Sequence, residues 1–184
     1  MSNGQEAVAA APVAAAASVA AAARIAAAWQ LLATVEDPEI PALSIVDLGL
    51  IRFAKVGLDG ILNVGLSPTY VGCPATEVIR RSAQDVLRQG HVGDFKVTSV
   101  LSPAWSSDWI TAEGRRRLLE YGIVPPEDRT VSNMRDVLRS SRPAACPRCQ
   151  SVDTETLSEF GSTPCKALHR CRACLEPFEY FKCI

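Results

Sequence analysis

Residues 50–66 read Leu-Ile-Arg-Phe-Ala-Lys-Val-Gly-Leu-Asp-Gly-Ile-Leu-Asn-Val-Gly-Leu, two apolar runs separated by a turn. The pair Asp59-Gly60 is a strong hairpin signal, because these residue types tolerate the backbone conformation that a tight turn requires. The two runs therefore predict a β-hairpin with strands over residues 50–56 and 61–66.

Helical patterns flank this hairpin on both sides. Residues 24–35 before it and residues 74–89 after it carry apolar side chains at helical spacing. Residues 95–101 then predict a third strand, and residues 111–121 a last helix that Gly122 closes. This order of elements predicts an α/β domain over residues 24–124, in which a small mixed sheet is covered by helices.

The segments outside that domain have simpler compositions. Residues 1–23 are mostly alanine and contain no Lys or Arg. We expect a disordered, low-complexity extension here, not a signal peptide or a membrane span, although alanine itself favours helix. Residues 125–143 mix Pro, Ser and charged residues and predict a linker, which leaves residues 144–184 as a cysteine-rich tail.

Composition excludes several classes of protein. The chain has 184 residues, 48% of them hydrophobic, and a formal net charge of −1, which gives no reason to expect a nucleic acid or an acidic membrane as partner. Six of the seven cysteines follow residue 145, without a recognisable secretion signal. We therefore expect a cytoplasmic protein. In the cytoplasm, cysteines commonly bind metal or carry out chemistry.

The tail contains two C-x2-C pairs, Cys146 with Cys149 and Cys171 with Cys174. The 21 residues between the pairs are one more than the usual spacing of a zinc ribbon, an extension that a loop accommodates easily. Four thiolates suit a closed tetrahedral zinc site. About forty residues form too small a core to fold alone, so we expect the metal to hold this zinc-ribbon-like tail together.

Two further cysteines leave an alternative open. Cys165 and Cys183 are possible additional metal ligands, and Cys165-x5-Cys171-x2-Cys174 nearly matches the spacing of a plant-type [2Fe–2S] site. An iron–sulfur cluster is therefore the alternative cofactor to zinc.

Cys73 stands apart from the tail, directly before Pro74 and the predicted helix. A thiol at the positive end of a helix dipole is favoured as thiolate, which suits a functional role. A small buried apolar cap is the other interpretation, and the residues alone leave both open.

Several motifs resemble two related families. Residues 37–41 (DPEIP), 46–51 (VDLGLI) and 68–75 (PTYVGCPA) resemble the iron–sulfur-assembly accessory domain of SufT-type proteins. Residues 102–109 and 176–183 (EPFEYFKC) resemble the D-subunit family of the bacterial phenylacetyl-CoA epoxidase system.

These resemblances imply a role and a set of residues. Cys73 becomes the functional thiol, and the neighbouring motif residues are Asp37, Glu39, Asp47, Thr69 and Tyr70. The implied role is an accessory component of the multicomponent ring epoxidase of aerobic phenylacetate degradation, which assists maturation of iron or iron–sulfur centres. The implied partners are the oxygenase and reductase subunits of that system.

The sequence indicates no reaction of its own. It contains neither the Glu-x-x-His pairs of a di-iron oxygenase nor a Gly-rich dinucleotide fingerprint. We therefore expect a non-catalytic accessory subunit. The alternatives are a structural docking subunit of the oxygenase complex, or an electron-transfer component if the tail holds an iron–sulfur cluster.

Overall fold

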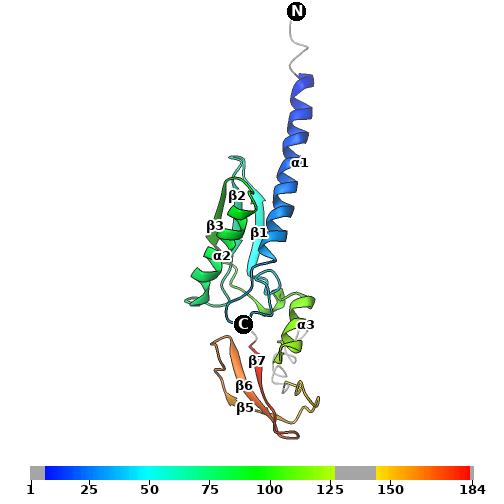
Figure 1. Ribbon diagram of the computed structural model, residues 1–184, viewed down its shortest axis with the longest axis vertical. Coiled ribbons are helices and arrows are strands. Elements are labelled where there is room, and N and C mark those ends of the chain that lie inside the picture. The colour runs from blue at the N-terminus through cyan, green and yellow to red at the C-terminus, as the bar shows by residue number, and fades with distance from the viewer. Residues whose placement is uncertain (1–6, 127–143, 183–184) are drawn as a thin grey trace, which may run out of the picture.

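The computed structural model describes residues 7–126 and 144–182 of the chain (Figure 1). Two sheets lie one after the other along the long axis of the molecule (Figure 1). We call the part built on the first sheet the body and the part formed by residues 144–182 the ribbon.

The first sheet confirms the predicted hairpin and the α/β class. Strands β1 (Ile51–Val56) and β2 (Leu62–Leu66) pair antiparallel, and β3 (Phe95–Ser99) pairs parallel with β2, so the sheet is mixed with order β1-β2-β3. Gly60 has φ +76° in the turn between β1 and β2, a conformation that glycine adopts without strain.

Two helices of the body pack their apolar faces against its sheet and against each other. Helix α2 (Ala75–Gln89) turns Ile79, Ala83 and Leu87 inward, each four residues after the last. Helix α1 (Ala7–Leu32) packs against β1 and α2 through its C-terminal part, where Leu32 is fully buried.

The prediction for residues 1–23 was wrong in part. Helix α1 begins at Ala7, so the alanine-rich stretch is continuous with the helix expected from residue 24 and extends beyond the sheet (Figure 1). Alanine has the highest helix propensity, and the packed C-terminal half supplies the nucleus from which the helix continues. Residues 1–6 of the expected extension lie outside the described residues.

The end of the body leads into the second sheet. Thr111 caps α3 (Ala112–Glu120) by accepting a hydrogen bond from the Gly114 N–H at 2.9 Å, and the short helix η1 (Ser107–Trp109) precedes it. The sheet of the ribbon has order β4-β7-β6-β5, and it contains β4 (Ile123–Val124), β5 (Thr154–Ser158), β6 (Lys166–Cys171) and β7 (Pro177–Phe181).

Strand β4 corrects the expected boundary at residue 124. Its residues pair parallel with β7, Ile123 opposite Glu179 and Val124 opposite Tyr180, so the body contributes a strand to the ribbon's sheet. Most of the predicted linker, residues 127–143, lies outside the described residues.

The core also crosses between the two parts. Cys165 and Phe181 of the ribbon are buried in the same cluster as the body's apolar residues. A second, smaller cluster at the other end of the ribbon contains Cys146, Cys171 and Phe178. In the part of the chain that the structure describes, no helix is both long and apolar enough to cross a membrane.

Candidate functional site

Four thiols gather at one end of the ribbon. The Sγ atoms of Cys146, Cys149, Cys171 and Cys174 all lie within 4.8 Å of one another. The separations are 3.6 Å between Cys146 and Cys174 and 3.5 Å between Cys149 and Cys171. Ligands at Zn–S distances near 2.3 Å in a tetrahedron stand about 3.8 Å apart, so the four sulfurs fit one tetrahedral metal ion.

Two tight turns aim these sulfurs at one point. In the first, the Gln150 N–H donates to the Cys146 carbonyl at 2.9 Å, and Gln150 adopts φ +62°. In the second, Cys171 ends β6, and the Cys174 N–H donates to its sulfur at 3.5 Å. Each C-x2-C pair is therefore held in a turn by local hydrogen bonds of its backbone N–H groups.

Protons compete with a metal at this cluster. Hydrogen bonding from the Cys174 N–H, with further backbone and thiol donors, lowers the pKa of Cys171 to about 7. The hydrogen bond from the Glu176 N–H also lowers the pKa of Cys174. Burial and the three neighbouring sulfurs outweigh this effect and raise the pKa of Cys174 to about 12. Because all four ligands bind as thiolates, metal affinity falls as pH falls.

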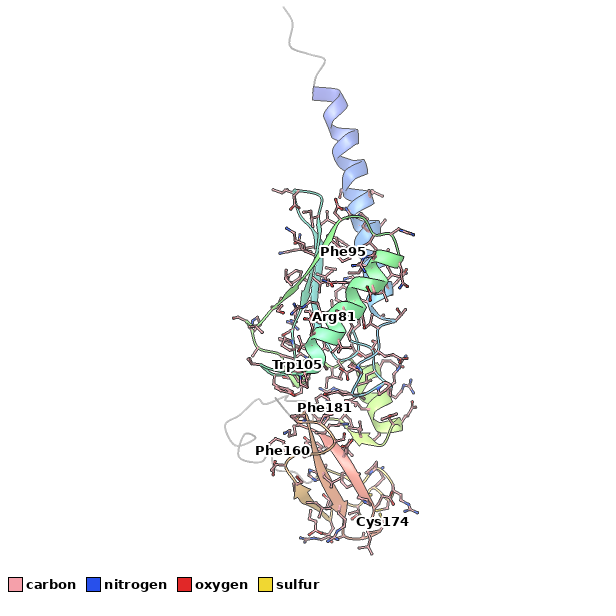
Figure 2. The ribbon with its side chains drawn as sticks, turned by 60° about the vertical axis from the view of Figure 1, so that its left-hand side comes forward. Arg81, Phe95, Trp105, Phe160, Cys174 and Phe181 are labelled. Atoms are coloured by element: carbon pink, nitrogen blue, oxygen red, sulfur yellow. The ribbon has the colours of Figure 1, made fainter. Side chains whose placement is uncertain are left out.

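Cys165 is not part of this cluster. It precedes β6, whereas Cys171 ends it, and six residues of strand span about 20 Å at about 3.3 Å per residue. In Figure 2, Cys174 lies at the far end of the ribbon, and Phe181 lies at the junction with the body. Phe181 is the last residue of β7 and pairs with Lys166, the residue after Cys165. The interpretation of Cys165, Cys171 and Cys174 as one iron–sulfur triad was therefore wrong, and Cys183 lies outside the described residues.

Cys165 lies instead in a pocket at the junction of the two parts, which we call the junction pocket. The space between the pocket's lining atoms is about 400 Å³, open solvent at its mouth included. Its wall from the body includes Cys73, Asp37, Glu39 and Thr69, four of the residues singled out from the sequence. Its wall from the ribbon includes Cys165 and Phe181.

The two acidic residues reach the pocket on one loop. Oδ1 of Asp37 accepts hydrogen bonds from the Glu39 N–H at 2.8 Å and the Ile40 N–H at 2.9 Å, which closes the loop around Pro38. Burial raises the pKa of Asp37 despite those two donors. Burial and the charge of Asp37 likewise raise the pKa of Glu39. The pocket therefore holds two carboxyl groups whose ionised forms are disfavoured.

The loop before α2 positions Cys73. The Cys73 N–H donates to the Tyr70 carbonyl at 3.3 Å, and the Cys73 carbonyl accepts from the Thr76 N–H at 3.2 Å, so the thiol is fixed just before the helix begins. The side chain is half-buried. Tyr70 lies beside it, and burial together with the Cys73 sulfur raises the pKa of the Tyr70 phenol.

Asp47 serves a different purpose from that expected. Its carboxylate accepts hydrogen bonds from the hydroxyls of Ser44 at 2.8 Å and Thr111 at 3.3 Å, and it pairs with Arg117 at 3.4 Å. It is absent from the residues that line the junction pocket in the described part of the chain. Asp47, the Asp of the VDLGLI motif, therefore joins the segment before β1 to the start of α3.

Sequence reasoning missed the residues that close the pocket. Ser67, directly after β2, lines it with a buried hydroxyl that has no hydrogen-bond partner among the described residues. Phe181 was part of a recognised motif but was not assigned to a site. No local pattern could place Cys165 in one pocket with Cys73, because they are 92 residues apart in the sequence and line the pocket together only when the ribbon docks.

Comparison with known proteins divides the chain in the same way. Residues 25–101 match the family described as iron–sulfur cluster assembly protein. Residues 131–182 match the PaaD zinc beta ribbon domain.

A protein of Escherichia coli (strain K12), provisionally named as the D component of 1,2-phenylacetyl-CoA epoxidase, is 45% identical over 157 residues, which cover 85% of this chain and 91% of that protein. This chain belongs to the D-subunit family of the phenylacetyl-CoA epoxidase system. The long, nearly end-to-end match carries the assignment, because both the body and the ribbon take part in it.

Two further relatives of the D-subunit family match a shorter part of the chain. A Porphyromonas gingivalis Fe-S protein maturation auxiliary factor is 34% identical, over 52% of this chain and 88% of its own. The Staphylococcus aureus maturation factor SufT is 33% identical, over 42% of this chain and 88% of its own.

A crystal structure of a domain of unknown function, DUF59, from Bacillus anthracis shares the fold of about half of this D-subunit family member. Its TM-score is 0.50 at 24% identity, and the match covers 55% of this chain and 96% of that domain.

Proposed function

We propose that this chain is a non-catalytic, cytoplasmic accessory component of the phenylacetyl-CoA ring epoxidase system. In this proposal it assists maturation of the iron or iron–sulfur centres of its partners, the oxygenase and reductase subunits. The names of its relatives support both halves of the proposal, one an epoxidase subunit and others Fe-S maturation factors. The observation that carries it is the junction pocket, where Cys73 lies with the carboxyl groups of Asp37 and Glu39.

The pocket's chemistry suits the handling of iron as cargo. A thiolate at Cys73 is a soft ligand for iron, and carboxylate oxygens add hard ligands beside it. Such a mixed ligand set binds an iron ion less tightly than four thiolates would, which suits transfer of the ion. Apolar walls that include Leu50 and Ile79 keep most water away from the sulfur. The Asp37 loop supplies its oxygens from a fixed position, since backbone bonds hold one carboxylate oxygen in place.

We propose zinc for the four-thiol site of the ribbon. The sulfur separations fit a tetrahedral ion, and the matched family is described as a zinc ribbon. When bound, zinc would supply structural cross-linking and no redox chemistry. A colourless protein with zinc supports this, whereas a brown protein with iron and sulfide would favour an electron-transfer component.

A docking subunit is the second candidate function. The ribbon exposes several apolar side chains, including Phe160 at 66% and Leu157 at 47% of their full exposure. Such side chains suit contact with another protein. In this interpretation Cys73 has no chemical role. The maturation function and the docking function therefore predict opposite effects of replacing Cys73.

Cys73→Ser decides between them. We expect the variant to fold and keep its zinc, but to leave the co-expressed oxygenase with several-fold less iron and lower epoxidase activity, because serine offers no thiolate to a soft metal. Val71→Ala, in the same loop and 84% exposed, is the matched control and should behave as wild type. Normal oxygenase iron and activity with Cys73→Ser would leave docking as the function.

A further inference from the structure

The junction pocket receives one thiol from each part of the molecule. Cys73 comes from the loop before α2, and Cys165 comes from the residue that precedes β6. The Lys182 N–H donates to the Cys165 carbonyl at 3.0 Å, so the pairing of β6 with β7 fixes the backbone at this thiol. Its sulfur lies 3.0 Å from the Thr163 hydroxyl. Both cysteines are therefore positioned by structure on either side of one cavity.

Oxygen donors stand within electrostatic reach of the second thiol. Burial raises the pKa of Cys165, and the charges of Glu39 and Asp37 add to that effect. Both carboxyl groups line the same pocket as Cys165 and Cys73. Lys166, which pairs with Glu179 at 3.0 Å, acts in the opposite direction, because its positive charge favours the ionised forms of the thiol and of both carboxyl groups.

A buried hydroxyl in the pocket lacks a partner. Ser67 is 1% exposed, and its Oγ makes no hydrogen bond among the residues that the structure describes. A buried hydroxyl left without a partner costs about 1–3 kcal/mol, and such groups in native proteins commonly mark a bound water or ion. This observation is independent of the cysteines and points to an occupant of the pocket.

We propose that Cys73 and Cys165 together bind one thiophilic divalent ion in the junction pocket, with the carboxylate of Glu39 as oxygen ligand. The assignment of Cys165 rests on the proposed function of Cys73 and extends it. Binding releases both thiol protons to solvent and involves no change of oxidation state. Ser67 contacts the ion's remaining water, which gives its hydroxyl a partner.

The ligands of the junction pocket suit a site that exchanges its metal ion. Among the described residues, the four ribbon thiols are the only group of three or more possible ligands within 4.8 Å of one another, so the junction ligands must close around an ion. Three protein ligands leave a coordination position open, as in sites where a metal meets a substrate. The ribbon carries one of the two sulfurs, so the site is complete only while the ribbon is docked on the body.

Cobalt(II) titration of the full-length chain, loaded with one equivalent of zinc, under anaerobic conditions tests this. Zinc keeps the four-thiol site, because it binds such ligands more tightly than cobalt. We expect one further equivalent of Co²⁺, seen as thiolate-to-metal charge-transfer absorption. Cys73→Ser, Cys165→Ser and Glu39→Gln should each weaken it roughly tenfold or more, as loss of a supporting or direct ligand does in known sites. Thr76→Ala, which alters the same wall without removing a ligand, should bind as wild type.

Alkylation of the wild-type chain gives a readout that needs no variant. Co²⁺ should protect Cys73, the more exposed of the two thiols, from iodoacetamide, as measured by peptide mass spectrometry. Unchanged Co²⁺ binding by Cys165→Ser would overturn the role of Cys165 and leave the proposed function standing. Absence of a second equivalent in wild type would overturn the site altogether, and oxygenase iron content would still decide the accessory function.

Discussion

The rings of Trp105 and Phe181 pack with their centroids 6.0 Å apart and their planes tilted by 52°, across the junction between body and ribbon (Figure 2). The Trp105 indole N–H donates to the Leu48 carbonyl at 3.0 Å, which fixes the ring on the body's side. Phe181 is 1% exposed and also lines the junction pocket. One aromatic contact therefore both joins the two parts and shapes the candidate site.

Phe181→Ala should separate the ribbon from the body. Truncation of a fully buried phenylalanine costs about 3–5 kcal/mol, through lost burial and the cavity left behind. Denaturant unfolding should show that loss, or a second transition for the ribbon. Phe160→Ala is the control, because Phe160 is largely exposed and its replacement should cost about 1 kcal/mol or less, including its contact with Lys182. Equal effects of the two substitutions would contradict a shared core.

Gly49→Ala should destabilise the body strongly. Gly49 has φ +67°, and a Cβ there would come within 2.4 Å of the Trp109 carbonyl oxygen. The left-handed backbone alone costs about 1–2 kcal/mol for other residues, and the contact with backbone adds to it. Gly60→Ala provides the comparison, since Gly60 has φ +76° but open space around its Cβ. The difference between their free energies of unfolding isolates the contact with Trp109, and no difference would refute it.

The zinc that stays bound through purification should depend on the four ribbon thiols. We expect about one zinc per chain for wild type, and loss of zinc with unfolding of the ribbon for Cys146→Ser or Cys171→Ser, because a structural site fails when one of four ligands is removed. Cys165→Ser should keep its zinc, since Cys165 lies at the opposite end of β6. Elemental analysis of the purified variants checks this. If Cys165→Ser loses its zinc while the ribbon stays folded, Cys165 is a ligand of the ribbon's zinc after all.

Asp37→Asn should stabilise the chain near pH 7. Burial raises the pKa of Asp37 in the folded state, so the folded chain holds this proton more tightly than the unfolded chain. Wild-type stability therefore falls as pH rises from about 4 through the raised pKa, whereas the asparagine variant does not lose this contribution. Asparagine keeps an acceptor oxygen for the Glu39 and Ile40 N–H groups.

Unfolding free energies at pH 4 and pH 7 check that prediction. The advantage of Asp37→Asn should be present at pH 7 and shrink at pH 4. Asp59→Asn, in the exposed hairpin turn, should change stability little at either pH. A stabilised variant that also lowers oxygenase iron would show that Asp37 is kept for function at the expense of stability. A less stable Asp37→Asn chain at pH 7 would rule this out.

The sequence by itself determined the features that depend on neighbouring residues. The Asp59-Gly60 turn and the apolar runs around it predicted the hairpin of β1 and β2, and helical spacing predicted α2. The two C-x2-C pairs predicted the four ligands that the structure brings within 4.8 Å of one another. Each of these is a local pattern, because turn conformation, helix periodicity and ligand spacing act over a few residues.

Only the tertiary structure decided which distant residues share a site. Proximity in sequence grouped Cys165 with Cys171, but an extended strand separates them, while docking of the ribbon brings Cys165 to the pocket of Cys73. Membership of one motif set likewise grouped Asp47 with Cys73, although Asp47 binds Ser44 and Thr111. The physical reason is the same in both cases. Strand direction and long-range burial place side chains that local spacing cannot place.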